Sequence, residues 1–147
     1  MAFVFRLETV LNVRRSREEQ VQQKLGHELF VLENHRQYLE ELKQKRAETA
    51  EQFDQRKKQN MVASLFSFFV EALRHLERDV EFQKNAIQAQ EQTVQKVREE
   101  LTEKVKERKI VERLREKDHL EYLKEVQRKE QNDMDEMAVL RHGQETL

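Results

Sequence analysis

The 147-residue sequence contains no proline, no cysteine and no tryptophan, and it has only two glycines, Gly26 and Gly143. Proline and glycine are the residues that most often end a helix, and neither glycine lies near the middle of the chain. Their scarcity predicts helices of unusual length. The absence of cysteine excludes disulfide bonds and thiolate metal sites, and it is typical of proteins from a reducing compartment.

The chain also lacks an excess of charge and a long apolar stretch. With 28 basic and 29 acidic residues its net charge is -1, so no overall field draws it to nucleic acid or to an anionic membrane. Its most apolar window, residues 61–70, is half as long as the roughly 20 residues that a membrane-spanning helix needs. No secretory signal is visible at the N-terminus. We therefore expect a soluble, cytoplasmic protein without direct bilayer insertion.

A short basic stretch, Arg14 to Arg17, precedes a row of leucines, as in DNA-binding leucine zippers. The likeness fails because Glu18 and Glu19 follow at once, and because Leu7 and Leu11 occupy positions where base contacts would begin. We expect no nucleic-acid partner.

What the chain does contain is apolar residues at alternating spacings of three and four, the heptad pattern of coiled coils. The first series is Leu7, Leu11, Val21, Leu25, Leu32, Leu39, Leu42 and Phe53. The second is Val62, Phe66, Phe69, Leu73, Leu76, Val80, Ile87, Val94, Val97 and Leu101. Polar residues interrupt them at Arg14, Glu18, Glu28, His35, Arg46, Thr49, Gln83 and Gln90. Such interruptions predict a seam that gives up stability for register or choice of partner.

The apolar stripe lapses at residues 54–60, and this lapse predicts a turn. We expect helix one over about residues 3–54, the turn over 55–60, helix two over 61–141 with Asn60 as its cap, and a frayed tail over 142–147. Two helices joined by a short loop lie antiparallel. The predicted fold is therefore all-α: a single-domain, long two-helix antiparallel coiled coil, or helical hairpin, over residues 1–147.

The unequal helix lengths predict a C-terminal helical overhang. With the turn near residue 57, Leu7 would lie opposite residues 107–111, and everything beyond about Leu114 would be unpaired. This overhang carries the apolar residues Leu120, Tyr122, Leu123, Val126, Met134, Met137 and Leu140. An amphipathic helix without a partner in its own chain is typical of a docking element. The alternative is that a second copy of the chain covers it.

A second apolar feature lies at the start of helix two, where apolar side chains occur all round the helix. They are Val62, Leu65, Phe66, Phe68, Phe69, Val70 and Leu73. They either plug the hairpin tip against helix one or remain partly exposed and bind a partner.

No catalytic, cofactor or metal site is expected, because two helices form a ridge and not a water-excluding pocket. No histidine lies next to Ser16, Ser64 or Ser67 to activate a nucleophile. Glu116 and His119 have the spacing of a di-iron ligand pair, but the second copy that such a site needs is missing.

Both ends of the chain resemble those of the FliJ family, soluble components of the bacterial flagellar type III export apparatus. The matching stretches are Phe3-Val-Phe-Arg-Leu-Glu-Thr-Val-Leu-Asn-Val-Arg-Arg and Asp135-Glu-Met-Ala-Val-Leu-Arg-His. At the start of helix two, Phe69, Ala72, Leu76 and Val80 fit a family pattern of an aromatic followed by apolar residues, with Ala72 where a larger residue is usual. Phe66, Phe69 and Leu73 form a competing frame.

The resemblance implies a non-enzymatic stalk and chaperone escort, similar to the terminal helices of the rotary ATP synthase gamma subunit. The end bearing both termini would enter the pore of the hexameric flagellar export ATPase and favour its assembly. The other end would contact the cytoplasmic domain of the membrane export gate, with export chaperones as further partners. The expected location is the cytoplasmic face of the inner membrane at the flagellar base.

On this basis the ATPase-facing residues are expected to be Phe3, Leu7, Leu11, Leu123, Val126, Met134, Met137 and Leu140. The gate-facing residues are expected to be Phe66, Phe69, Leu73 and Leu76. Two alternatives remain open. One is the equivalent stalk of a virulence-type secretion injectisome, and the other is a self-associating structural coiled coil without an ATPase partner.

Overall fold

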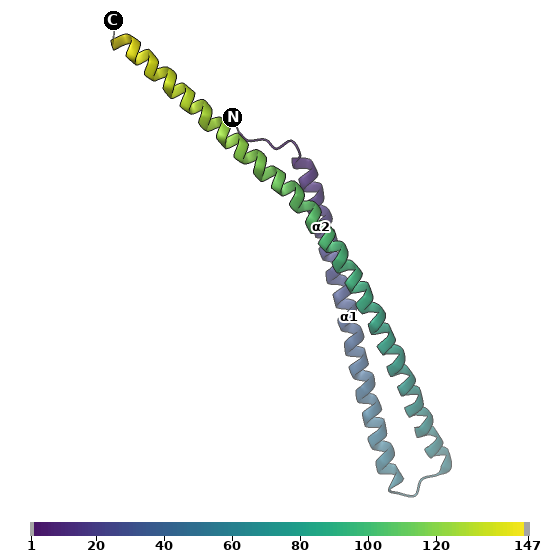
Figure 1. The fold of residues 1–147 in the computed structure, drawn as a ribbon. Coiled ribbons are helices and arrows are strands. Elements are labelled where there is room, and N and C mark those ends of the chain that lie inside the picture. Colours follow the sequence, from purple (N-terminus) through teal and green to yellow (C-terminus); the bar gives the residue numbers. More distant parts are fainter. Residues whose placement is uncertain (1, 146–147) are drawn as a thin grey trace. The chain divides into compact units, whose positions relative to one another are not determined.

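The computed structural model of the protein describes residues 2–145, which form two helices and no strand (Figure 1). Helix α1 (Glu8–Lys57) has 50 residues and helix α2 (Ala63–Glu145) has 83. The chain divides into two compact units. The terminal unit comprises Met1–Gln20 and Thr102–Leu147, and the hairpin unit comprises Val21–Leu101. The expected all-α helical hairpin with a C-terminal helical overhang is confirmed.

The core of each unit is the heptad seam between α1 and α2. In the hairpin unit Leu42 packs against Leu76 and Val80. In the terminal unit Leu11 and Val111 pack together and are joined by Phe5 from the segment before α1. Leu11 and Val80 are almost completely inaccessible to solvent, although each belongs to a pair of helices with solvent on every other side. Side chains at a and d positions can reach this burial because each inserts between residues of the facing helix.

Helix α1 begins at Glu8, so the expected start near residue 3 was wrong. A turn closed by a hydrogen bond from the Glu8 amide to the Phe5 carbonyl, at 3.2 Å, precedes the helix. Residues two apart in a helix point about 200° apart, so a helix could bring only one of Phe3 and Phe5 onto α2. In the observed non-helical segment Phe5 is buried and Phe3 packs beside it.

The turn also differs from the expected one, because it occupies residues 58–62 and not 55–60. Helix α1 continues to Lys57, where the Lys57 ammonium lies 3.8 Å from the centre of the Phe53 ring. Helix α2 begins at Ala63, and its first hydrogen bonds close on the Val62 carbonyl. Asn60 is therefore not the residue that caps α2. At the other end α2 is helical through Glu145, and residues 146 and 147 of the expected frayed tail lie outside the described residues.

The later turn changes which residues face one another in the terminal unit. Glu8 lies opposite Arg115, with the carboxylate 3.1 Å from the guanidinium Nε, and Leu11 lies opposite Val111. Leu7 was expected to lie opposite residues 107–111, but that place is taken by Leu11, several residues further along the chain. An extended chain also covers about 3.3 Å per residue against 1.5 Å in a helix, so the segment before α1 reaches further along α2. Pairing therefore continues past Leu114 to Tyr122, where the ring of Phe3 is 5.5 Å from that of the tyrosine.

The polar interruptions of the seam pair with one another across the two helices. In the hairpin unit the Gln83 amide donates to the His35 carbonyl at 3.0 Å and lies 2.9 Å from Nδ1 of the same histidine. The Gln90 amide bonds to Glu28 in the same way. Among the described residues no buried side-chain nitrogen or oxygen atom lacks a hydrogen-bond partner.

Candidate functional site

The overhang, defined here as residues 123–145 of α2, presents an uncovered apolar face. Leu123 is 48% exposed, Met134 66%, Met137 56% and Leu140 68%. Shallow hollows lie along this part of α2, one beside Val126 and another beside Met134 and Met137. The overhang is helical throughout, so its side chains are already arranged as a helix that docks on a partner would need them.

An aromatic contact marks the base of the overhang. The ring of Phe3 lies 4.7 Å from the ring of His119, edge to face, and it also contacts Tyr122. Leu7 packs near it and is half-buried, whereas Leu11 is fully buried in the seam. Of the residues expected to face an ATPase, Leu11 thus lies inside the hairpin and Phe3 and Leu7 lie at the overhang base. The remaining five lie on the overhang.

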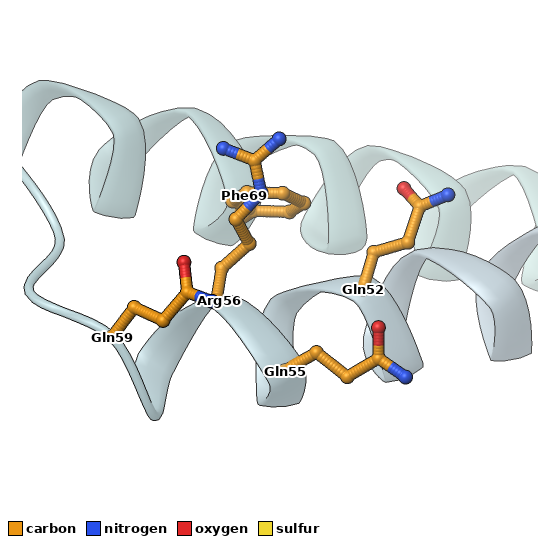
Figure 2. A pocket seen from close by; sticks show the side chains of 5 residues that line it. All are labelled: Gln52, Gln55, Arg56, Gln59 and Phe69. Atoms are coloured by element: carbon orange, nitrogen blue, oxygen red, sulfur yellow. The ribbon is translucent and has the colours of Figure 1, made fainter.

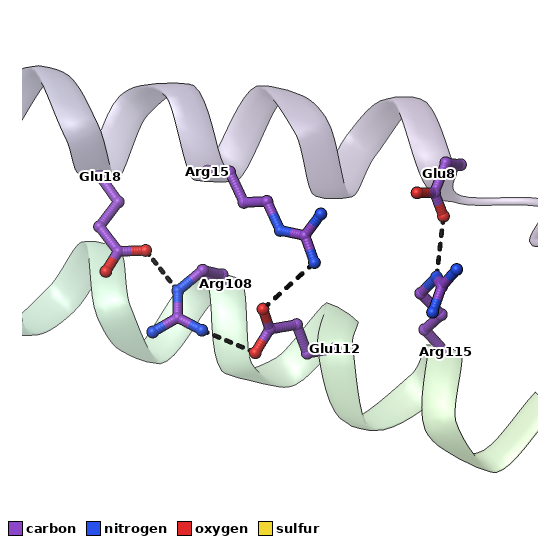
Figure 3. A network of polar contacts seen from close by, with 6 residues as sticks. All are labelled: Glu8, Arg15, Glu18, Arg108, Glu112 and Arg115. Atoms are coloured by element: carbon purple, nitrogen blue, oxygen red, sulfur yellow. Dashed lines mark hydrogen bonds and ion pairs between the residues drawn. The ribbon is translucent and has the colours of Figure 1, made fainter.

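A network of ion pairs joins α1 to α2 within the terminal unit (Figure 3). Arg108 lies at its centre and donates hydrogen bonds to Glu18 across the seam and to Glu112 one turn away, the latter at 2.6 Å. Arg15 approaches Glu112 from α1, at 3.5 Å. The hydrogen bond from Arg108 lowers the pKa of the Glu112 carboxyl below its ordinary value. In turn the bonds to Glu18 and Glu112 raise the pKa of the Arg108 guanidinium.

The hairpin tip carries the second surface. The Phe53 ring of α1 lies 5.2 Å from that of Phe69 and 5.3 Å from that of Phe66. Phe69 and Leu76 are buried in the seam, Leu73 is half-buried and Phe66 is exposed. Of the four residues expected to face the export gate, only Phe66 and Leu73 therefore offer accessible surface.

The exposed neighbour of these residues is Phe68, whose side chain is 65% accessible. Sequence reasoning placed Phe68 in the apolar cluster but not among the gate-facing residues, because the heptad pattern favoured the seam positions Phe69 and Leu76. A residue just outside the seam stripe is the one that stays exposed in a two-helix hairpin.

A polar hollow near the tip was not expected from the sequence (Figure 2). It is lined by Gln52, Gln55 and Arg56 at the end of α1, by Gln59 of the turn and by Phe69 of α2. Amides and a guanidinium can hydrogen-bond an extended backbone or a carboxylate. No sequence pattern marked Gln52, Gln55 and Arg56, since they are polar positions on an exposed helix face.

The residues considered for chemistry occupy exposed positions on the two helices. Ser16, Ser64 and Ser67 are exposed on helices, and His119 stacks on Tyr122. Within residues 2–145 no group of three or more histidine, aspartate and glutamate side chains is placed to hold a metal ion. In the same range, neither helix offers a stretch that is both long and apolar enough to cross a bilayer.

A helical hairpin with an uncovered amphipathic extension and an aromatic tip defines a coiled-coil protein with exposed apolar surfaces. The chain belongs to the FliJ family, because the family's sequence model, described as Flagellar FliJ protein, matches residues 3–146. Members of this family are non-catalytic components of flagellar type III protein export. The resemblance inferred from the two ends of the chain is thus confirmed over nearly its whole length.

Among solved structures, that of a proposed YscO homolog from Chlamydia trachomatis has the same fold. The TM-score is 0.71, and the alignment covers 96% of each chain at 22% sequence identity. At this identity the likeness concerns the fold. No match is found among curated protein sequences.

Proposed function

We propose that this protein is a non-enzymatic stalk and chaperone escort of the flagellar export apparatus. In this role it promotes assembly of the hexameric export ATPase and links that enzyme to the membrane export gate. Family membership supports a place in type III export. The observation that carries the finer proposal is the overhang, a helix of the terminal unit whose apolar face nothing in the described chain covers.

The ATPase side of the proposal rests on Leu123, Val126, Met134, Met137 and Leu140. These side chains lie on one face of a helix and are accessible without any rearrangement of the hairpin. Phe3 and Leu7 would extend the same surface at its base, while Leu11 would act by holding α1 against α2. A helix inserted into a groove or pore buries such a stripe, and this burial would favour the assembled ring.

The test is ATP hydrolysis and ring assembly by the cognate flagellar export ATPase, with and without the full-length protein. The variant Met134→Gln, Met137→Gln, Leu140→Gln keeps the helix but removes three apolar side chains. We expect the wild type to stimulate both activities and the variant to lose most of that effect. The matched control is Val139→Gln, because Val139 is 71% exposed but lies on the opposite face of α2. Absence of stimulation by the wild type would reject the proposal.

The gate side of the proposal rests on Phe66 and Leu73, with the exposed Phe68 beside them. Phe69 and Leu76 would contribute by packing the tip against α1. We expect Phe66→Ser with Phe68→Ser to weaken binding to the cytoplasmic domain of the gate protein while ATPase stimulation is retained. Equal loss of both activities in a folded variant would show that the two surfaces do not have separate roles.

Export chaperones are proposed as further partners, and the proposed location is the cytoplasmic face of the inner membrane at the flagellar base. Two competing functions have distinct outcomes. Stimulation of an injectisome ATPase in preference to the flagellar one would assign the protein to a virulence-type system. A dimeric mass in light scattering, together with no effect on either ATPase, would indicate a structural coiled coil.

A further inference from the structure

Two heptad rows run along the uncovered face of the overhang, and each has the same pattern. One row is Leu123, Glu130 and Met137, and the other is Val126, Asp133 and Leu140. In each row an acidic residue lies between two apolar ones. Because residues seven apart lie on nearly the same side of a helix, Glu130 and Asp133 occupy the middle of the apolar face.

Neither acidic side chain has a partner in the described part of the chain. Glu130 and Asp133 are exposed and make no hydrogen bond or ion pair there. Asp135 and Glu136 follow, and no basic residue occurs between Lys129 and Arg141. The centre of the docking face is therefore acidic as well as apolar.

The same chain shows what such positions require when a helix covers them. In the terminal unit Glu18 is a buried seam residue, and Arg108 of the facing helix donates a hydrogen bond to it. In the hairpin unit Glu28 lies at a seam position and receives the Gln90 amide at 2.6 Å. A carboxylate taken out of water without a donor is strongly unfavourable, so the covering surface has to supply one.

We infer that the overhang docks into an apolar, helix-wide groove whose partner surface carries arginine or lysine side chains opposite Glu130 and Asp133. This inference rests on the proposed function, in that the groove belongs to the protein that the overhang engages there. It adds the chemistry of the partner surface: apolar at both ends of the contact and basic at its middle. Arginine suits this position best, because its planar group can bond both carboxylate oxygens at once.

Two other occupants fit this face poorly. A second copy aligned antiparallel, with Leu123 against Leu140, would set Glu130 against Asp133, and a parallel copy would set each acidic residue against its own equivalent. An anionic lipid surface would repel the acidic centre of the face. Both occupants would bring like charges together in the region where water is excluded.

The test compares the affinity of the full-length chain for the flagellar export ATPase in low and high salt. The variant Glu130→Gln, Asp133→Asn removes both charges and keeps the size of the side chains. We expect it to bind at least about tenfold more weakly in low salt, because a basic group of the partner is left buried without its counter-ion. We also expect its affinity to depend less on salt than that of the wild type.

The matched control is Glu121→Gln with Asp135→Asn, which removes the same charge from the opposite face of α2. This control is expected to bind like the wild type. Binding by Glu130→Gln, Asp133→Asn that equals or exceeds that of the wild type would overturn the inference and show that the two carboxylates only keep the stripe soluble. Absence of binding by the wild type would instead reject the proposed function on which the inference rests.

Discussion

The side-chain amide of Gln90 donates two hydrogen bonds to a single residue of the facing helix, Glu28. One reaches the Glu28 carboxylate at 2.6 Å and the other reaches its carbonyl at 3.0 Å. The side-chain amide of Gln83 likewise contacts both the ring and the carbonyl of His35. This second pair lies seven residues from the first along each helix. The polar residues of the seam can make both sets of contacts only when the two helices are in one register.

The first prediction concerns this register. Replacing both pairs by leucine removes the need to match polar groups across the seam. We therefore expect the free energy of unfolding to stay the same or rise, while the two helices become able to pair in more than one register. The variant is Glu28→Leu, His35→Leu, Gln83→Leu, Gln90→Leu. By contrast, Gln90→Leu alone leaves Glu28 without its donor and should lower the free energy of unfolding by about 1–3 kcal/mol.

Cross-linking measures the pairing, since the native chain has no cysteine. Leu42 packs on Leu76, so a cysteine pair at these two positions should oxidise readily in the otherwise native chain. A pair at Thr49 and Leu76, displaced by one heptad, should oxidise only when the four polar residues are leucines. Equal oxidation of the displaced pair in both backgrounds would show that the polar steps do not set the register.

The second prediction concerns pH. The folded protein lowers the pKa of the Glu112 carboxyl from its ordinary 4.5, mainly through the hydrogen bond from Arg108. Below pH 4.5 the Glu112 carboxylate binds a proton more readily in the unfolded chain than in the folded protein. The stability that the Arg108 contact contributes is therefore present above pH 4.5 and is lost as the pH falls through the pKa of Glu112 in the folded protein. Glu112→Gln should therefore lose less stability on acidification than the wild type.

Urea unfolding at neutral and at acidic pH measures this difference. Glu99→Gln is the matched control, because Glu99 is exposed and does not belong to the network around Arg108. An identical acid sensitivity of the wild type and Glu112→Gln would show that the Arg108 contact does not contribute to stability.

The third prediction separates packing from exposure at the hairpin tip. Phe69 is buried against Phe53, so Phe69→Ala should lower the free energy of unfolding by about 3 kcal/mol. Phe68 is mostly exposed, so Phe68→Ala should change it by less than about 0.5 kcal/mol. Denaturation followed by circular dichroism measures both. Similar losses for the two variants would contradict the observed burial of Phe69.

The fourth prediction concerns the segment before α1. The ring of Phe3 contacts those of His119 and Tyr122, so Phe3→Ala should speed amide hydrogen exchange in α2 around these residues. Val4 is 84% exposed, and Val4→Ala should leave exchange there unchanged. Unaltered exchange in Phe3→Ala would mean that the aromatic contact does not stabilise the base of the overhang.

Much of the fold could be predicted because it depends on local pattern. The lack of proline, the heptad spacing and the polar steps all act within a few turns of one helix, where the 3.6-residue period decides which side chains share a face. For this reason the seam positions of Leu11 and Val80, and the polar positions of Glu28 and Gln90, were identified from the sequence and lie in the seam of the structure.

The site was predicted less completely, because exposure depends on which residues meet across the hairpin. The sequence alone determined long helices, a two-helix seam and an apolar stripe on the C-terminal segment. Only the tertiary structure decided that Phe69 and Leu76 are covered while Phe66 remains accessible, and that pairing continues to Tyr122. The physical reason is that register is a property of both helices together: a shift of the turn by a few residues changes every cross-helix contact while leaving each helix's own pattern intact.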